Sequence, residues 1–180
     1  MYKILVSDKL AEDAINMLKK EKDIECVVKT GMDENQLTEE LPNYDALIIR
    51  SGTKVTAKTL SKVTKLKIIG RAGVGVDNVD MQAATSKGII VMNTPDANTL
   101  STAEQTITLI LGLARNLPQV DASLKAKKWE RNKFVGTELY GKTIGIIGLG
   151  RIGTEVAKRM LAFGMKVIAH DPFVTKEKAD

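Results

Sequence analysis

Short apolar runs alternate with amphipathic segments along the first half of the chain. Five of these runs are rich in β-branched residues and have the length of strands, and their unbroken hydrophobicity is typical of strands buried on both faces of a sheet. This alternation predicts an α/β fold built on a doubly wound parallel sheet. The predicted strands are Lys3–Val6, Ile24–Val28, Ala46–Ile49, Leu66–Ile69 and Ile89–Met92.

Two of the intervening segments have apolar residues at the spacing of a helix. The second of them follows Asn78, a residue type that is common at helix N-caps. Both segments are therefore predicted to be helices that cover the sheet. Their apolar positions are Leu10, Ala14, Met17 and Leu18 in the first, and Val79, Ala83 and Ala84 in the second.

Pro95 lies in a run of turn-forming residues and marks a candidate domain junction, with a boundary between residues 97 and 98. A longer helix is predicted to follow. Ser101 and Glu104 have the spacing of a capping box, and the helix should end before Pro118. Its apolar stripe consists of Ala103, Ile107, Ile110, Leu111 and Ala114.

The segment from Asp121 to Tyr140 shows little periodicity and is interpreted as a solvated arm. It is rich in basic residues and contains the only tryptophan of the chain. These residues are Lys125, Lys127, Lys128, Trp129, Arg131 and Lys133.

Composition narrows the functional classes. The 180 residues carry a formal charge of +5, but the basic residues are interspersed with acids and aromatic residues make up only 4%, which argues against nucleic-acid binding and favours a small anionic substrate. Cys26 is the single cysteine and is interpreted as a buried strand residue, and no Cys/His cluster indicates a metal site. No apolar run is long enough to span a membrane, and the N-terminus is interpreted as a strand rather than a signal peptide. A cytoplasmic protein is expected.

Gly148, Gly150 and Gly153 stand at G-x-G-x-x-G spacing between a predicted strand and a predicted helix. In that context the first glycine permits a tight turn, the second lets the backbone approach a pyrophosphate, and the third lets the helix pack closely on the strand. Amide groups at the start of the helix then face the anion. The alternative is a glycine-rich turn that holds no ligand.

Asp171 adds weight to the dinucleotide interpretation. It follows the next predicted strand, Met165–Ala169, and stands 171 − 153 = 18 residues after the last glycine. An acidic residue about 20 residues beyond such a turn binds the ribose hydroxyls of the adenosine. Because a carboxylate there would repel a 2′-phosphate, the sequence favours NAD over NADP.

Several further stretches are distinctive when they are read together with the glycine turn. They are Ile49–Thr56, Gly70–Asp80, Val91–Pro95, Lys128–Arg131 and the pair Asp171–Pro172. With them the chain resembles the D-2-hydroxyacid dehydrogenase family over essentially its whole length, and most closely those members that oxidise 3-phosphoglycerate.

The resemblance implies two domains. Residues 1–97 would form a flavodoxin-like substrate-binding domain. Residues 98–180 would begin a Rossmann NAD-binding domain and include an interdomain helix and an arm around Trp129 through which subunits pair. The implied reaction is NAD-dependent oxidation of D-3-phosphoglycerate to 3-phosphohydroxypyruvate, the first step of L-serine biosynthesis, in a homodimer or homotetramer.

The resemblance also assigns site residues. The substrate phosphate and carboxylate would be held by two arginines at strand ends, by glycine-rich backbone and by a hinge residue. For the arginines, ordinary surface ion pairs remain the alternative. The substrate-binding set is Arg50, Ser51, Gly52, Arg71, Gly73, Val74, Gly75 and Asn98. The cofactor-binding set is Val74, Gly148, Gly150, Arg151, Ile152, Gly153, Asp171 and Pro172.

The chain departs from the family in its catalytic groups. The family supplies an Arg, a Glu and a His from the later part of the cofactor domain, and none has a counterpart in these 180 residues. The only histidine, His170, adjoins Asp171 at the adenosine end and is interpreted as a strand-end residue rather than a proton donor. We therefore expect an incomplete dehydrogenase sequence, or alternatively a catalytically silent module that binds an anion or a nucleotide.

Overall fold

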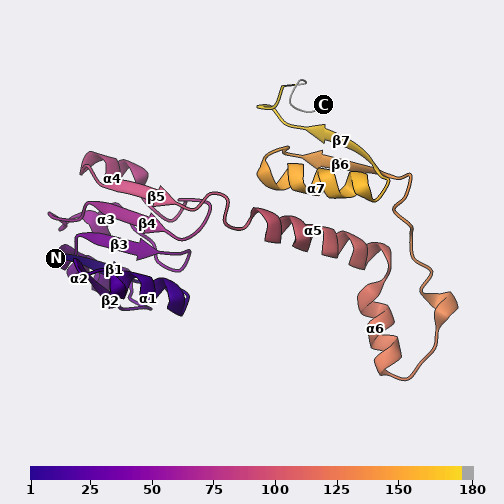
Figure 1. Cartoon of the computed structure of the whole chain (residues 1–180), viewed down its shortest axis with the longest axis horizontal. Coiled ribbons are helices and arrows are strands. Elements are labelled where there is room, and N and C mark those ends of the chain that lie inside the picture. The colour runs from indigo at the N-terminus through magenta and orange to yellow at the C-terminus, as the bar shows by residue number, and fades with distance from the viewer. Residues whose placement is uncertain (176–180) are drawn as a thin grey trace. The chain divides into compact units, whose positions relative to one another are not determined.

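The computed structural model describes residues 1–175, which form two compact units with their boundary between Ala97 and Asn98, the N-terminal unit and the C-terminal unit. The N-terminal unit contains a five-stranded parallel sheet and the C-terminal unit a two-stranded parallel sheet (Figure 1). The predicted α/β class with parallel sheets is confirmed. The strands are β1 Tyr2–Val6, β2 Ile24–Val28, β3 Ala46–Ile49, β4 Ile68–Arg71, β5 Ile90–Asn93, β6 Thr143–Ile147 and β7 Lys166–His170.

The sheet of the N-terminal unit has the strand order β2-β1-β3-β4-β5. The chain first adds a strand on one side of β1 and then reverses to add three on the other side, so the sheet is doubly wound. In such sheets ligands bind at the carboxyl ends of the strands where the order reverses. Here that point lies between the ends of β1 and β3, just before Asp8 and Arg50.

Polar side chains cap three of the four α-helices of the N-terminal unit, whereas the helix Glu12–Lys20 begins after Ala11 and has no side-chain cap. Asp33 forms a capping box with Gln36, and Asp80 caps the last helix by accepting a hydrogen bond at Oδ1 from the Ala83 amide at 2.9 Å. The expectation that Asn78 caps this helix is therefore wrong, because the Asn78 side chain is hydrogen-bonded to Arg50, Thr53 and Arg71. The helices are α1 Glu12–Lys20, α2 Glu34–Glu40, the 3-10 turn η1 Leu41–Asn43, α3 Ala57–Leu60 and α4 Met81–Ser86.

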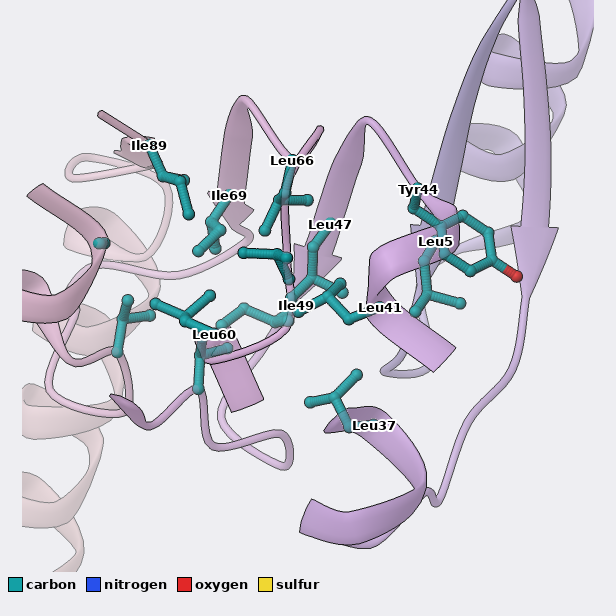
Figure 2. Packing of buried hydrophobic residues seen from close by; sticks show 14 residues of the cluster. Leu5, Leu37, Leu41, Tyr44, Leu47, Ile49, Leu60, Leu66, Ile69 and Ile89 are labelled. Carbon is teal, nitrogen blue, oxygen red and sulfur yellow. The ribbon is translucent and has the colours of Figure 1, made fainter. Parts of the chain in front are cut away.

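The core of the N-terminal unit lies on one face of the sheet, where leucine and isoleucine side chains from the strands meet those of the helices (Figure 2). Leu5, Leu47 and Ile69 are aligned across three strands and fully buried. On the opposite face, Ile68 and Ile90 are 38% and 59% exposed. The expectation of strands buried on both faces thus fails at β4 and β5, because their apolar character does not reveal which face is covered.

The C-terminal unit packs its longest helix against α7 and the small sheet. Its core contains Ala103 and Ile107, two residues of the predicted stripe, with Val156 and Met160. No helix among residues 1–175 has both the length and the apolar character to cross a bilayer. The elements are α5 Thr99–Ala114, α6 Leu117–Lys125, the 3-10 turn η2 Arg131–Lys133 and α7 Arg151–Ala162, with β6 and β7.

Two expectations about this unit are wrong. The capping box at Ser101 does not form, because α5 already begins at Thr99 and the Ser101 hydroxyl donates to the Asn98 carbonyl. The segment after residue 120 is not wholly an irregular arm, because a second helix runs from Leu117 to Lys125. The longer helix does end before Pro118, at Ala114, as predicted, and Pro118 itself lies in the first turn of the next helix, where proline is well tolerated.

Candidate functional site

The glycine turn connects β6 to α7 within the C-terminal unit. Gly148 directly follows β6 and has a φ of +92°, which strongly favours glycine over any residue with a side chain. Its amide donates to the His170 carbonyl at 2.8 Å and so ties the end of β6 to the end of β7. The chain then turns and enters α7 at Arg151, with Gly150 at the N-cap.

The other two glycines have opposite surroundings. A Cβ atom added to Gly153 would fall on the carbonyl oxygen of Gly148, so only glycine lets α7 pack this closely on the turn. A Cβ atom added to Gly150 would meet nothing within 4 Å. The surface above Gly150 is therefore open, and the backbone there can be approached by a ligand.

Asp171 faces this turn. Its Oδ2 accepts a hydrogen bond from the Leu149 amide at 2.7 Å, and its Oδ1 accepts one from the Phe173 amide at 2.8 Å. The hydrogen bond from Phe173, together with the one from Leu149, lowers the pKa of Asp171 below its usual value. The carboxylate is therefore ionised at neutral pH, and its remaining lone pairs can accept hydrogen bonds from a ligand.

These groups suit a diphosphate that is joined to a sugar. The first amides of a helix have no partner within the helix, and at α7 they lie beside the open surface above Gly150. The partial positive charge of the helix start attracts an anion to the same place. A carboxylate bonded to the turn itself then stands where it can accept hydrogen bonds from sugar hydroxyls.

A second polar cluster lies at the strand ends of the N-terminal unit. After β3 the chain forms the turn Arg50–Thr53, which we call the first turn. Asp8, just beyond β1, holds it: Oδ2 of Asp8 accepts from the Arg50 amide at 2.6 Å and from the Thr53 amide at 3.1 Å. A Cβ atom on Gly52 would lie 2.6 Å from Oδ1 of Asp8, so glycine leaves room for this carboxylate.

The turn Gly73–Asn78 after β4, which we call the second turn, is built around Arg71. The Arg71 side chain is only 11% exposed, its Nε donates to Oδ1 of Asn78 at 2.8 Å, and its Nη2 lies 3.7 Å from Oδ1 of Asp77. A Cβ atom on Gly73 would lie 2.5 Å from Nη1. Glycine therefore allows the guanidinium to lie across the backbone of this turn.

Arg50 differs from Arg71 in its surroundings. The residue is exposed, and no carboxylate within residues 1–175 is paired with its guanidinium. An open cavity of about 520 Å³ adjoins the first turn and is lined in part by Ser51, Lys54 and Asn78. The charged residues that line this cavity are Lys54, Asp77 and Asp80, whereas the exposed Arg50 directly precedes the lining residue Ser51.

The structure brings most of the sequence-predicted residues into two groups. Arg50, Ser51, Gly52, Arg71, Gly73, Val74 and Gly75 lie on the two turns of the N-terminal unit, and the amide of Ala72 donates to the Ile49 carbonyl between them. Gly148, Gly150, Arg151, Ile152, Gly153, Asp171 and Pro172 lie around the glycine turn of the C-terminal unit. Asn98 is the N-cap of α5 and also belongs to the C-terminal unit.

Sequence reasoning missed Asp8 and the bridging role of Asn78. A usable signal for Asp8 was its position after the first strand of a doubly wound sheet, where polar residues reach the ligand-binding edge. No comparable signal exists for Asn78, because its three partners lie on two other segments, the first turn and the end of β4.

The sequence matches, over residues 4–179, the family described as D-isomer specific 2-hydroxyacid dehydrogenase, catalytic domain. The chain belongs to this family. Among its relatives is a D-3-phosphoglycerate dehydrogenase of Methanocaldococcus jannaschii, 56% identical over 180 residues, which are all of this chain and 34% of that protein. The chain thus spans about a third of the length of this relative.

Solved structures of this family agree with the fold described above. The crystal structure of the TT0316 protein from Thermus thermophilus is 34% identical, with a TM-score of 0.88 over 97% of this chain and 57% of the other. The NAD⁺-bound 3-phosphoglycerate dehydrogenase of Entamoeba histolytica is 32% identical, with a TM-score of 0.77 over 98% of this chain and 56% of the other.

Proposed function

We propose that this chain carries the substrate and cofactor sites of a dehydrogenase that oxidises D-3-phosphoglycerate to 3-phosphohydroxypyruvate with NAD, the first step of L-serine biosynthesis. The N-terminal unit is the flavodoxin-like substrate-binding domain, and the C-terminal unit belongs to a Rossmann NAD-binding domain. The observation that carries the proposal is the ionised Asp171 carboxylate, bonded to Leu149 inside the glycine turn.

NAD, when bound, supplies the acceptor for the hydride of the hydroxy acid. The protein's part is to hold it. Backbone of the glycine turn, with Arg151 and Ile152 at the start of α7, binds the pyrophosphate, while Asp171 and Pro172 bind the adenosine end. Val74 contributes from the N-terminal unit. The Entamoeba histolytica relative, whose structure contains NAD⁺, supports this assignment.

The substrate is a small 2-hydroxy acid with a second anionic group. Arg50 and Arg71 bind the phosphate, the amides of Val74 and Gly75 bind the carboxylate, and Ser51, Gly52, Gly73 and Asn98 complete the set. Val74 is exposed, and Gly75 has no side chain of its own, but Oδ1 of Asp77 lies 2.8 Å from the position that a Cβ atom on Gly75 would take. The name of the Methanocaldococcus jannaschii relative supports phosphoglycerate as the substrate.

The proposed enzyme is a homodimer or a homotetramer. Large apolar side chains are exposed along α5 and α6 and on the following arm: Leu113 is 81% exposed, Leu117 57% and Trp129 80%. Contiguous exposed apolar surface is typical of a protein–protein interface. A second copy of the chain would cover it.

A second candidate function is a module that binds NAD and an anion without catalysing the reaction, and it is suggested by the position of the chain's only histidine. Oxidation of a hydroxyl group needs a proton acceptor, and reduction of the resulting carbonyl needs a proton donor; in both cases this group is commonly a histidine. His170 is the last residue of β7, next to Asp171, which assigns it to the adenosine end. The 180 residues by themselves would then be a catalytically silent module that binds NAD and an anion. Turnover of NAD with D-3-phosphoglycerate by the purified chain would contradict this alternative.

The substrate assignment predicts that Arg50→Gln weakens binding of D-3-phosphoglycerate about tenfold, because one charge-assisted contact to the phosphate is lost. Binding of D-glycerate, which has no phosphate, should change less than about twofold. Isothermal titration of the chain with both compounds measures the difference. Lys62→Gln, which removes one exposed cation next to Glu39, is the matched control. Equal losses for the two compounds would contradict the phosphate contact.

A further inference from the structure

We propose that Asn78 is a positioning residue that locks the two anion-binding turns of the N-terminal unit into one arrangement. This inference rests on the function proposed above, because it concerns the same substrate site. Asn78 itself is not among the groups assigned to the substrate. Its effect is exerted through Arg50, Thr53 and Arg71.

The side-chain amide of Asn78 has three hydrogen-bond partners, two on the first turn and one at the end of β4. Nδ2 donates to the Arg50 carbonyl at 2.7 Å and to the Thr53 carbonyl at 2.6 Å, so both ends of the first turn are held. Oδ1 accepts from Nε of Arg71 at 2.8 Å. Both hydrogens of the amide are therefore used, together with one of its acceptor positions.

Only an amide side chain of this length satisfies all three partners. Aspartate could accept from Arg71 but has no hydrogen to donate, so two carbonyls would lose their donors and face a negative charge. Alanine would leave all three groups without this partner. Unmade hydrogen bonds of groups that are removed from water cost about 1–3 kcal/mol each.

The backbone fixes Asn78 beneath the first turn. The Val55 amide donates to the Asn78 carbonyl at 2.8 Å, and the Asp80 amide donates to the Val55 carbonyl at 2.7 Å. Val55 and Val79 form a parallel bridge and are both buried. This short ladder fixes the backbone of the half-buried Asn78 next to the buried Val79, and the three hydrogen bonds of the Asn78 side chain hold its amide in place.

Asp8 holds the same turn from its other side. The carboxylate of Asp8 accepts the amides of Arg50 and Thr53, while Asn78 donates to the carbonyls of the same two residues. At both ends of the first turn, the backbone amide and the backbone carbonyl are thus each hydrogen-bonded to a side chain. Because Asn78 also accepts from Nε of Arg71, it joins the backbone of Arg50 to the side chain of Arg71.

The test compares Asn78→Ala with Asn43→Ala, which removes an exposed amide on η1. In the ligand-free chain, we expect the Arg50 and Thr53 amides to exchange with solvent about tenfold faster in Asn78→Ala, with no change in Asn43→Ala. In a titration followed by NMR, D-3-phosphoglycerate should shift the amides of Gly52 and Gly75 along one isotherm in the unchanged protein. In Asn78→Ala its dissociation constant should rise about tenfold.

A second variant guards against loss of the fold. Asn78→Asp retains the acceptor for Arg71, so its second turn should stay ordered while the Arg50 and Thr53 amides still exchange faster. Unchanged exchange in both variants, or a dissociation constant for Asn78→Ala within about twofold of the unchanged protein, would overturn the proposal. If the unchanged chain bound no phosphoglycerate, the proposed function would fail and with it the role of Asn78 in anion binding. The exchange rates would still decide whether Asn78 joins the turns.

Discussion

Gly153→Ala is expected to destabilise the C-terminal unit and to abolish measurable NAD binding, because the added methyl group would fall on the carbonyl oxygen of Gly148. Overpacking of this kind costs about 3 kcal/mol, of which the better helix propensity of alanine offsets about 1 kcal/mol. The helix must move away from the turn, and the amides at its start move with it. Calorimetric unfolding and NAD titration of the variant measure both effects.

Gly150→Ala is the matched control for that substitution. Its methyl group meets no atom within 4 Å, and Gly150 has a φ of −74°, so stability should change by no more than about 0.5 kcal/mol. NAD binding should nevertheless weaken about tenfold, because the methyl group occupies the surface that the pyrophosphate approaches. Wild-type stability of Gly153→Ala would contradict the close packing of α7. Unchanged NAD binding by Gly150→Ala would contradict the place assigned to the pyrophosphate.

Asp171→Ala is expected to weaken NAD binding about 100-fold and NADP binding much less. Two charge-assisted hydrogen bonds to the ribose hydroxyls are worth about 3 kcal/mol together, which corresponds to about 100-fold in the dissociation constant. NADP gains from loss of the carboxylate, because its 2′-phosphate is no longer repelled. Fluorescence titration with the two reduced nucleotides measures the ratio of dissociation constants, which should shift toward NADP by about tenfold or more.

Two further variants separate the charge of Asp171 from its support of the turn. Asp171→Asn retains an acceptor for the Leu149 amide but loses the charge, so it should lose discrimination against NADP while the turn is kept. Asp121→Ala removes an exposed carboxylate of α6 that is paired with Lys125, and it should change neither affinity. If Asp171→Ala weakened both nucleotides equally, the carboxylate would be supporting the turn and not selecting the ribose.

Local sequence patterns predicted the secondary structure well wherever an element depends only on residues that are close together in the sequence. The apolar run Ala46–Ile49 is strand β3 with the same bounds, and the glycine turn lies between a strand and a helix as its spacing predicts. Spacing along the chain also predicted an acidic residue beside that turn. Asp171 lies there because β6 and β7 are parallel neighbours, and their carboxyl ends share one edge.

Features that depend on distant segments could not be predicted in this way. Asn78 and Asp80 are both good capping residues, and the choice of Asp80 follows from contacts of Asn78 with residues 25 and 28 positions earlier. Pro118 is compatible with either the end of one helix or the start of another. Ile90 is exposed because it lies on the face of the sheet opposite the core, and the apolar sequence of a strand does not indicate which of its faces is covered.

The central claim is that the turn from Gly148 to Gly153, together with Asp171, binds NAD. The most direct measurement is a titration of the isotopically labelled chain with NAD, followed through the backbone amides by NMR. We predict saturable shifts of the Gly150, Arg151 and Ile152 amides, with the Leu149 amide that is bonded to Asp171 shifting on the same isotherm. A folded chain in which these four amides stay unshifted at saturating NAD would contradict the account.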